Sequence, residues 1–162
     1  MKDVRVGFST TDAPISRIIR WVTQSRASHC FFLYASEDLG KDVVMEAATE
    51  GFRVMPWDVF RKRNRVIQVV TPAPTYPLVP AVRKIAEHLG SAYDFGGLAG
   101  AGAVVAAKRG GFRIKNATAS SHSLFCSEAV VRALQLAGYP GTEKMDPEGT
   151  TPEDLRLFFM GG

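Results

Sequence analysis

The chain has 162 residues, of which 46% are hydrophobic and 22% charged, and its formal net charge at pH 7 is +4. This composition excludes a disordered chain, and the length favours a single domain over residues 1–162. The longest uncharged apolar run, residues 95–107, is shorter than the roughly 20 residues that a membrane-spanning helix needs. No apolar signal core follows Met1, so we expect a cytoplasmic protein. Because that compartment is reducing, we expect its cysteines to be free thiols.

Strands dominate the first part of the chain. Alternating apolar and polar residues predict a strand over residues 3–9. Thr11 or Asp12 is suited to cap a helix with Pro14 in its first turn, and this helix is expected to end near Gln24. Further strands are predicted over residues 28–35, 42–47, 52–55 and 65–71. Short turns join most of these strands, which favours an antiparallel sheet.

Basic residues gather in one place, residues 61–65. This segment lies between a short helical turn predicted over residues 56–60 and the strand at 65–71, which is an ordinary position for a solvated basic loop. The alternative interpretation is contact with an anionic membrane surface or another phosphate-rich partner. The mild net charge gives no reason to expect a nucleic acid partner.

Helices dominate the second part of the chain. Four prolines within residues 72–80 predict an extended linker. Residues 91–111 are rich in Gly and Ala, and no element is assigned to them. Apolar stripes and end signals predict helices over residues 79–89, 126–137 and 153–158. Together with the strands, these helices predict an α+β domain with a mostly antiparallel sheet packed against helices.

Cys126 is placed where a polar loop is predicted to turn into a helix. The free N–H groups and positive partial charge of a helix N-terminus favour the thiolate, which is the nucleophilic form of cysteine. The chain has one other cysteine and three histidines, so few bases are available to such a nucleophile. The alternative is that Cys126 is an inert, small apolar residue of the core.

His29 and Glu46 are the candidate partners of Cys126. His29 opens an apolar strand, where its ring can meet the start of a helix, although it can also be an ordinary core histidine. Glu46 lies in the otherwise apolar segment 43–48, where a buried and unpaired carboxylate would be costly. Pairing with His29 on a neighbouring strand would remove that cost. The alternative for Glu46 is a solvent-facing position at the strand end.

The remaining polar candidates are weaker. His88 lies on the polar side of its predicted helix, and His122 lies in a Ser-rich loop four residues before Cys126. Tyr93 follows a turn, and its phenol O–H is suited to bind an oxyanion together with the backbone N–H of Cys126, or else to make an ordinary hydrogen bond in the core.

No metal or other cofactor is expected. His29 and Cys30 are adjacent in a predicted strand, so their side chains point in opposite directions, and the chain has no Cys-x-x-Cys spacing. A phosphate-binding loop of the Gly-x-x-x-x-Gly-Lys type is also absent from the sequence.

The order of these motifs resembles the circularly permuted branch of the NlpC-type papain-like hydrolases, in which the histidine strand precedes the cysteine helix. The matching segments are residues 28–29, 45–47, 92–94 and 125–128. The resemblance implies a papain-like fold, with Cys126 as the nucleophile, His29 as the base, Glu46 as the residue that orients the base, and Tyr93 near the oxyanion.

The function expected from these residues is that of a cysteine hydrolase that forms an acyl-enzyme on Cys126. A peptide or acyl group would be its substrate, and the resemblance makes an amide, including that of a cell-wall peptide, the first choice. One alternative is a lipid-directed acyltransferase or thioesterase on the same scaffold, similar to the lecithin:retinol acyltransferase group, with residues 98–107 and 61–65 at a membrane surface. The other is a non-catalytic binding domain that keeps the fold.

Overall fold

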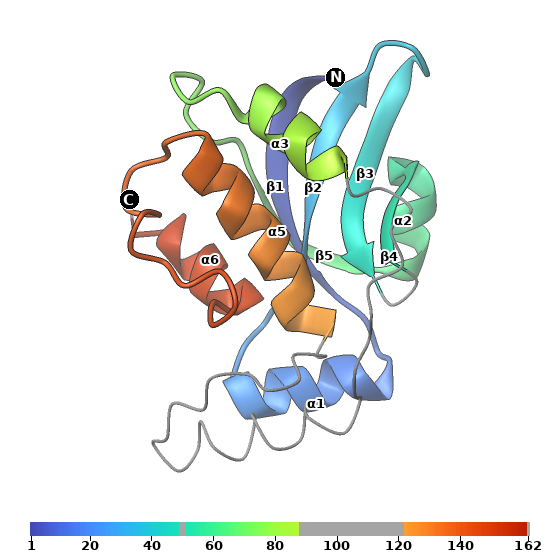
Figure 1. Ribbon diagram of the computed structural model, residues 1–162. Coiled ribbons are helices and arrows are strands. Elements are labelled where there is room, and N and C mark those ends of the chain that lie inside the picture. The colour runs from blue at the N-terminus through green and yellow to red at the C-terminus, as the bar shows by residue number, and fades with distance from the viewer. Residues whose placement is uncertain (49–50, 88–121, 162) are drawn as a thin grey trace.

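The computed structural model describes residues 1–48, 51–87 and 122–161 (Figure 1). The strands are β1 (Lys2–Thr10), β2 (His29–Ser36), β3 (Lys41–Ala48), β4 (Gly51–Pro56) and β5 (Arg65–Val70). The helices are α1 (Pro14–Thr23), α2 (Trp57–Arg63), α3 (Leu78–Ala86), α5 (His122–Leu136) and α6 (Pro152–Phe158). These elements form an α+β structure, as the sequence predicts.

The five strands form one sheet in the order β4-β3-β2-β1-β5, and every neighbouring pair is antiparallel. β2 therefore occupies the centre of the sheet, with β1 on one side and β3 on the other (Figure 1). The expectation of an antiparallel sheet is confirmed.

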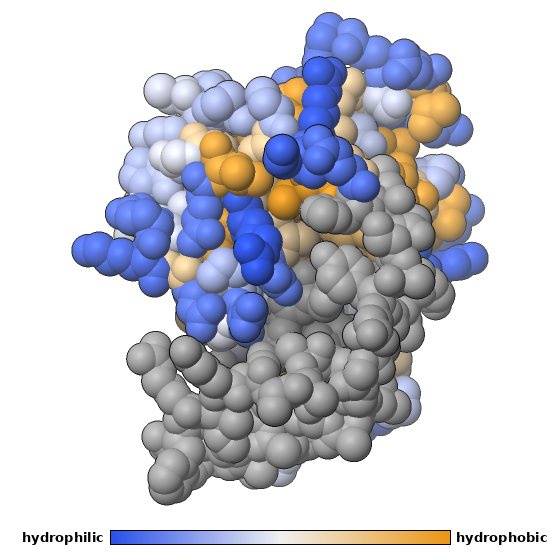
Figure 2. Space-filling model, in the orientation of Figure 1, coloured by the Kyte–Doolittle hydropathy of each residue, from blue (hydrophilic) through white to orange (hydrophobic). Residues whose placement is uncertain are grey.

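Apolar residues on the two faces of the sheet form two separate cores. Helices α3, α5 and α6 pack on one face, where buried residues such as Phe8, Phe32 and Leu134 form the larger cluster. On the other face, α2 contributes Phe60 to a smaller cluster with Phe31. Successive residues of a strand point to opposite faces, which is why Phe31 and Phe32 belong to different cores. Figure 2 shows hydrophilic side chains surrounding a smaller apolar area where Figure 1 places α3 and α5.

One glycine permits a close approach between β1 and β2. Gly7 pairs with Phe31 across the two strands, and a Cβ atom at position 7 would overlap the Phe31 ring. The missing side chain leaves the space in which this ring lies against the neighbouring strand.

Several predicted boundaries are wrong. The helix predicted from residue 126 begins at His122, which is therefore not in a loop. α2 continues through Arg61, Lys62 and Arg63, so these residues form a helix end and not a solvated loop. Arg and Lys are good helix formers, and their positive charges are favourable near a helix C-terminus.

The predicted linker over residues 72–80 ends earlier, because α3 begins at Leu78. Pro80 is the third residue of this helix, where its missing N–H would have had no partner within the helix. The N-cap of α1 is Ala13, without a side-chain hydrogen bond, and not Thr11 or Asp12. The helix predicted to run to residue 89 ends earlier, at Ala86, with Glu87 as its C-cap. The unassigned segment 91–111 lies outside the described residues.

Candidate active site

The site forms where β2 and β3 stop pairing. Registered pairs between these strands run from Ser36↔Lys41 to Phe32↔Met45 and do not continue to Cys30. At this position the backbone N–H of Cys30 donates a hydrogen bond to Sγ of Cys126, with an N–S distance of 3.4 Å. The sulfur atom of Cys126, on α5, therefore lies beside β2 just beyond the end of its pairing with β3.

His29 and Glu46 meet in the same gap. Nε2 of His29 lies 2.6 Å from Oε2 of Glu46. The imidazole side chain is 16% exposed and the carboxylate 4% exposed, so the pair is almost completely shielded from water. This contact confirms the prediction that the two strands are neighbours and that Glu46 is paired, and it rejects the solvent-facing alternative.

Two aromatic rings support the imidazole. The ring centroids of Phe31 and Phe60 each lie 6.4 Å from that of His29. Phe31 follows on the same strand face, and Phe60 reaches it from α2. The imidazole is therefore held beside the smaller core.

Arg53 is a further member of the site that was not predicted. It lies directly opposite Glu46 in the β3–β4 pairing, and its Nε and Nη2 atoms lie 2.9 Å and 2.8 Å from Oε1 of Glu46. Glu46 therefore accepts from Arg53 on one oxygen and from His29 on the other. A signal was present in the sequence, because the strands predicted over residues 42–47 and 52–55 bring positions 46 and 53 opposite each other if they pair as a hairpin.

The carboxylate of Glu46 is the ionised form in this environment. Burial by itself raises the pKa of Glu46, but the hydrogen bonds and positive charges of His29 and Arg53 outweigh it and hold this pKa below its ordinary value of 4.5. Glu46 is therefore a fixed negative charge next to the imidazole at neutral pH.

His29 and Cys126 stabilise each other in their charged forms. Burial lowers the pKa of His29, yet the charge and hydrogen bond of Cys126, together with those of Glu46, raise it to about 10. Burial likewise raises the pKa of Cys126, but hydrogen bonds from Cys30 and the charge and hydrogen bond of His29 hold it well below its ordinary value of 9.0. Because Glu46 occupies Nε2, the Nδ1 atom remains for the sulfur. The favoured state is a thiolate–imidazolium pair.

The predicted cause of the thiolate is wrong in one respect. Cys126 is the fifth residue of α5, one turn inside the helix, and not at the helix start. The free N–H groups and most of the dipole effect belong to the first turn. The sulfur is stabilised instead by His29 and by the N–H of Cys30, which belong to β2.

The segment before His29 is anchored to the C-terminal part of the chain. Oε2 of Glu153, on α6, accepts hydrogen bonds from the backbone N–H groups of Arg26 and Ala27, each at 3.2 Å. The hydroxyl oxygens of Ser28 and Thr10 lie 2.9 Å apart, which joins the same segment to β1. These contacts fix where β2 starts and hence where the imidazole lies.

Cys30 is the other residue that sequence reasoning did not assign to the site. It is buried on the α5 side of the sheet, opposite to His29, as the predicted alternation requires. Neither cysteine is in a disulfide. Tyr93 and His88 lie outside the described residues, and His122 is the first residue of α5.

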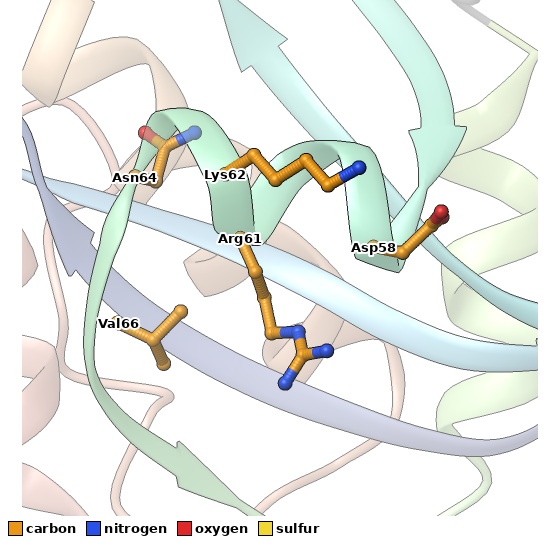
Figure 3. A pocket seen from close by; sticks show the side chains of 5 residues that line it. All are labelled: Asp58, Arg61, Lys62, Asn64 and Val66. Carbon is orange, nitrogen blue, oxygen red and sulfur yellow. The ribbon is translucent and has the colours of Figure 1, made fainter.

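A surface pocket is found elsewhere in the described part of the chain. It has a volume of about 430 Å³ and is lined by residues of α2 and the start of β5: Asp58, Arg61, Lys62, Asn64 and Val66 (Figure 3). Its lining contains neither Cys126 nor either of the residues proposed to act with it.

Within residues 1–48, 51–87 and 122–161, no helix has the length and apolar character needed to cross a membrane. In the same residues, no group of three or more His, Cys, Asp or Glu side chains is arranged to hold a metal ion.

Comparison with known proteins adds no relative. No protein-family model matches the sequence, and no curated protein matches it either.

Proposed function

We propose that the protein is a cysteine hydrolase that uses Cys126, His29 and Glu46 to cleave an acyl bond, with an amide as the first choice. The observation that supports this proposal is the electrostatic chain from the Cys126 sulfur through His29 to Glu46, in which the thiol pKa is lowered and the imidazole pKa raised. A thiolate beside an imidazolium that is itself oriented by a carboxylate is the combination that nucleophilic catalysis requires.

In the first step the Cys126 thiolate attacks the carbonyl carbon and forms a carbon–sulfur bond. The carbon–nitrogen bond then breaks as the His29 imidazolium gives its proton to the leaving amine. Glu46 keeps the imidazole in place through Nε2. The products of this step are a free amine and a thioester on Cys126.

Hydrolysis of the thioester uses the change in charge at the sulfur. The Cys126 charge is one of the causes that raise the pKa of His29, and acylation removes it. His29, now neutral, takes a proton from water, the hydroxide attacks the thioester, and the acid leaves. The thiolate and the imidazolium are thereby restored.

The sulfur is deeply placed for such a reaction, since Cys126 is only 1% exposed. A substrate carbonyl must therefore displace neighbouring side chains to reach it. We expect a slender acyl group to be accepted more readily than a branched one.

The proposal is tested with a panel of fluorogenic peptide, ester and thioester substrates. Activity is expected on at least one of them and is expected to disappear in Cys126→Ala and His29→Ala. As a matched control, Glu143→Gln changes an exposed acidic residue and should leave the rate unchanged. Activity that persists in Cys126→Ala would refute the proposed nucleophile.

A second candidate is a lipid-directed acyltransferase or thioesterase at an anionic membrane surface. It is favoured by the exposed side chains of Arg61, Lys62 and Arg63 at the end of α2. Co-sedimentation with vesicles that contain anionic lipid tests this candidate. The control is the variant that carries Arg61→Ser, Lys62→Ser and Arg63→Ser together. Binding lost in that variant, together with cleavage of esters but not peptides, would favour this candidate over the amidase.

A further inference from the structure

Cys126 has a second thiol next to it that the proposed hydrolysis does not use. The Sγ atom of Cys126 lies 3.4 Å from the backbone nitrogen of Cys30. The backbone nitrogen of Cys30 is bonded directly to its Cα, so the sulfur of Cys126 also lies close to the Cα of Cys30. The two thiols also interact directly, because a hydrogen bond between them contributes to the pKa shifts of both residues.

The two thiols differ in protonation. The pKa of Cys30 is raised well above 9.0, by burial first and then by the hydrogen bond and charge of Cys126, whereas that of Cys126 is lowered. A nucleophilic thiolate with a protonated thiol beside it is the arrangement in which one sulfur is oxidised and the other resolves the product. Both residues are 1% exposed, so only a small oxidant has ready access to them.

We propose that Cys126 and Cys30 form a reversible disulfide when the protein meets a peroxide, and that this bond protects the sulfur of Cys126 from irreversible oxidation. In the first step the Cys126 thiolate attacks one oxygen of hydrogen peroxide. The oxygen–oxygen bond breaks, hydroxide leaves, and the sulfur is oxidised to a sulfenic acid while the peroxide is reduced.

In the second step the sulfur of Cys30 attacks the sulfenic sulfur of Cys126. A sulfur–sulfur bond forms, the sulfur–oxygen bond breaks, and the leaving hydroxide takes the thiol proton of Cys30 to give water. Loss of the thiolate charge in the first step removes one of the causes that raise the pKa of Cys30, so its deprotonation becomes easier at the moment it is needed.

The positions of the residues suit this bond. Cys30 lies in the part of β2 beyond its last registered pair with β3, and Cys126 lies on α5, which packs against β2. A disulfide needs its sulfurs to approach to about 2.0 Å, and the hydrogen bond from the backbone N–H of Cys30 already holds the Cys126 sulfur beside the Cys30 backbone. The bond would consume the nucleophile and so switch off the proposed hydrolase.

The test counts thiols and does not depend on any enzyme activity. The protein is treated with increasing hydrogen peroxide, denatured in iodoacetamide and analysed by intact mass and peptide mapping. We expect the number of alkylated cysteines to fall from two to zero, the mass to lie two hydrogen atoms below that of the reduced protein before alkylation, and a single peptide pair to join residues 30 and 126 within one chain. Dithiothreitol should restore both thiols.

The matched control is Cys30→Ala, which keeps the proposed nucleophile and removes the resolving thiol. In this variant we expect Cys126 to proceed to sulfinic and sulfonic acids, which dithiothreitol does not reverse. A circular dichroism melt checks that the variant is folded.

Three outcomes would overturn the proposal. Both thiols could survive peroxide treatment, or Cys126 of the protein without substitutions could become overoxidised while Cys30 stays a thiol. The third is that disulfides form only between chains. Because the readout is mass, a negative result here leaves the proposed hydrolase standing. Conversely, an inactive substrate panel does not affect the disulfide.

Discussion

The imidazole of His29 is held between two charges of the same sign. Glu46 contacts its Nε2 atom, and the Cys126 thiolate contributes from another direction, which is why the pKa of His29 rises to about 10 even though burial opposes the charged form. Each of the three groups depends on the other two for its charge state. Single substitutions in the site should therefore change the titration of the remaining groups.

Replacing Glu46 with Gln should lower the pKa of His29, because both the charge of Glu46 and its hydrogen bond contribute to raising it. With the imidazolium less favoured, the pKa of Cys126 should rise. The measurement is an NMR titration of the His29 ring in both proteins. Glu143→Gln, a change of an exposed residue, serves as the control and should leave the titration unchanged. An unshifted His29 titration in Glu46→Gln would contradict the assigned contact.

Arg53 should act on the site through Glu46. Its guanidinium helps to lower the pKa of Glu46, so Arg53→Gln should raise that pKa and move the acid limb of the activity profile to higher pH. Arg53 is 41% exposed, so solvent screening should keep the loss of folding free energy below about 1 kcal/mol. Arg53→Lys should restore part of the shift, and an acid limb equal to that of the unmodified protein would argue against this role.

At the scale of elements, the site depends on how tightly β1 and β2 pack. The ring of Phe31 lies in the space over Gly7 and beside the ring of His29. It also contacts Phe60, with a distance of 4.5 Å between ring centroids. The smaller core and the orientation of the imidazole thus share one aromatic side chain.

Gly7→Ala should destabilise the protein, because the new methyl group and the Phe31 ring cannot occupy the same space. Overpacking of this kind costs roughly 1–3 kcal/mol. Urea denaturation of the unmodified protein and the variant gives the difference in unfolding free energy. Gly161→Ala, where the nearest atom in contact is 3.6 Å away, should change it little. Equal stabilities for Gly7→Ala and the unmodified protein would show that the ring can move freely.

The strands could be predicted because they alternate apolar and polar residues, and the contact between His29 and Glu46 followed from the short turn joining their strands. The start of α5 could not, because the serines before Cys126 are common in loops and are also tolerated in a first helical turn. The role of Cys30 depended on which helix covers its face of the sheet. That placement is a property of the tertiary packing and leaves no mark in local periodicity.

For the whole molecule, the charged pair links folding to pH. Between pH values of 6.5 and 9.0, the ordinary values of His and Cys, the unfolded chain holds one proton on Cys126, and the folded chain holds one on His29. The pair contributes no pH dependence in this range. Below pH 6.5 the unfolded chain binds a second proton that the folded pair excludes, so stability falls as pH falls through this region.

We therefore expect the unfolding free energy to be nearly flat from about pH 7 to 8.5 and then to decrease toward acid, by up to about 1.4 kcal/mol per pH unit until Cys126 takes up its proton. It should also decrease as pH rises toward the raised pKa of His29, which is about 10. In Cys126→Ala the decrease between pH 5 and 6.5 should become smaller, because the folded chain no longer excludes a proton from a sulfur while Glu46 still favours the charged imidazole. Denaturant titrations at each pH provide the comparison, and identical acid slopes in the two proteins would contradict the linkage.

The measurement that tests the central claim most directly is the ultraviolet absorbance of the thiolate, recorded against pH as the difference between the unmodified protein and Cys126→Ala. It needs no substrate and no access to the buried sulfur. The expected result is a full thiolate signal at neutral pH that disappears only in acid, well below the ordinary range of cysteine. A signal that appears only as pH rises toward 9.0, the ordinary pKa of a cysteine thiol, would show that Cys126 is not paired with His29.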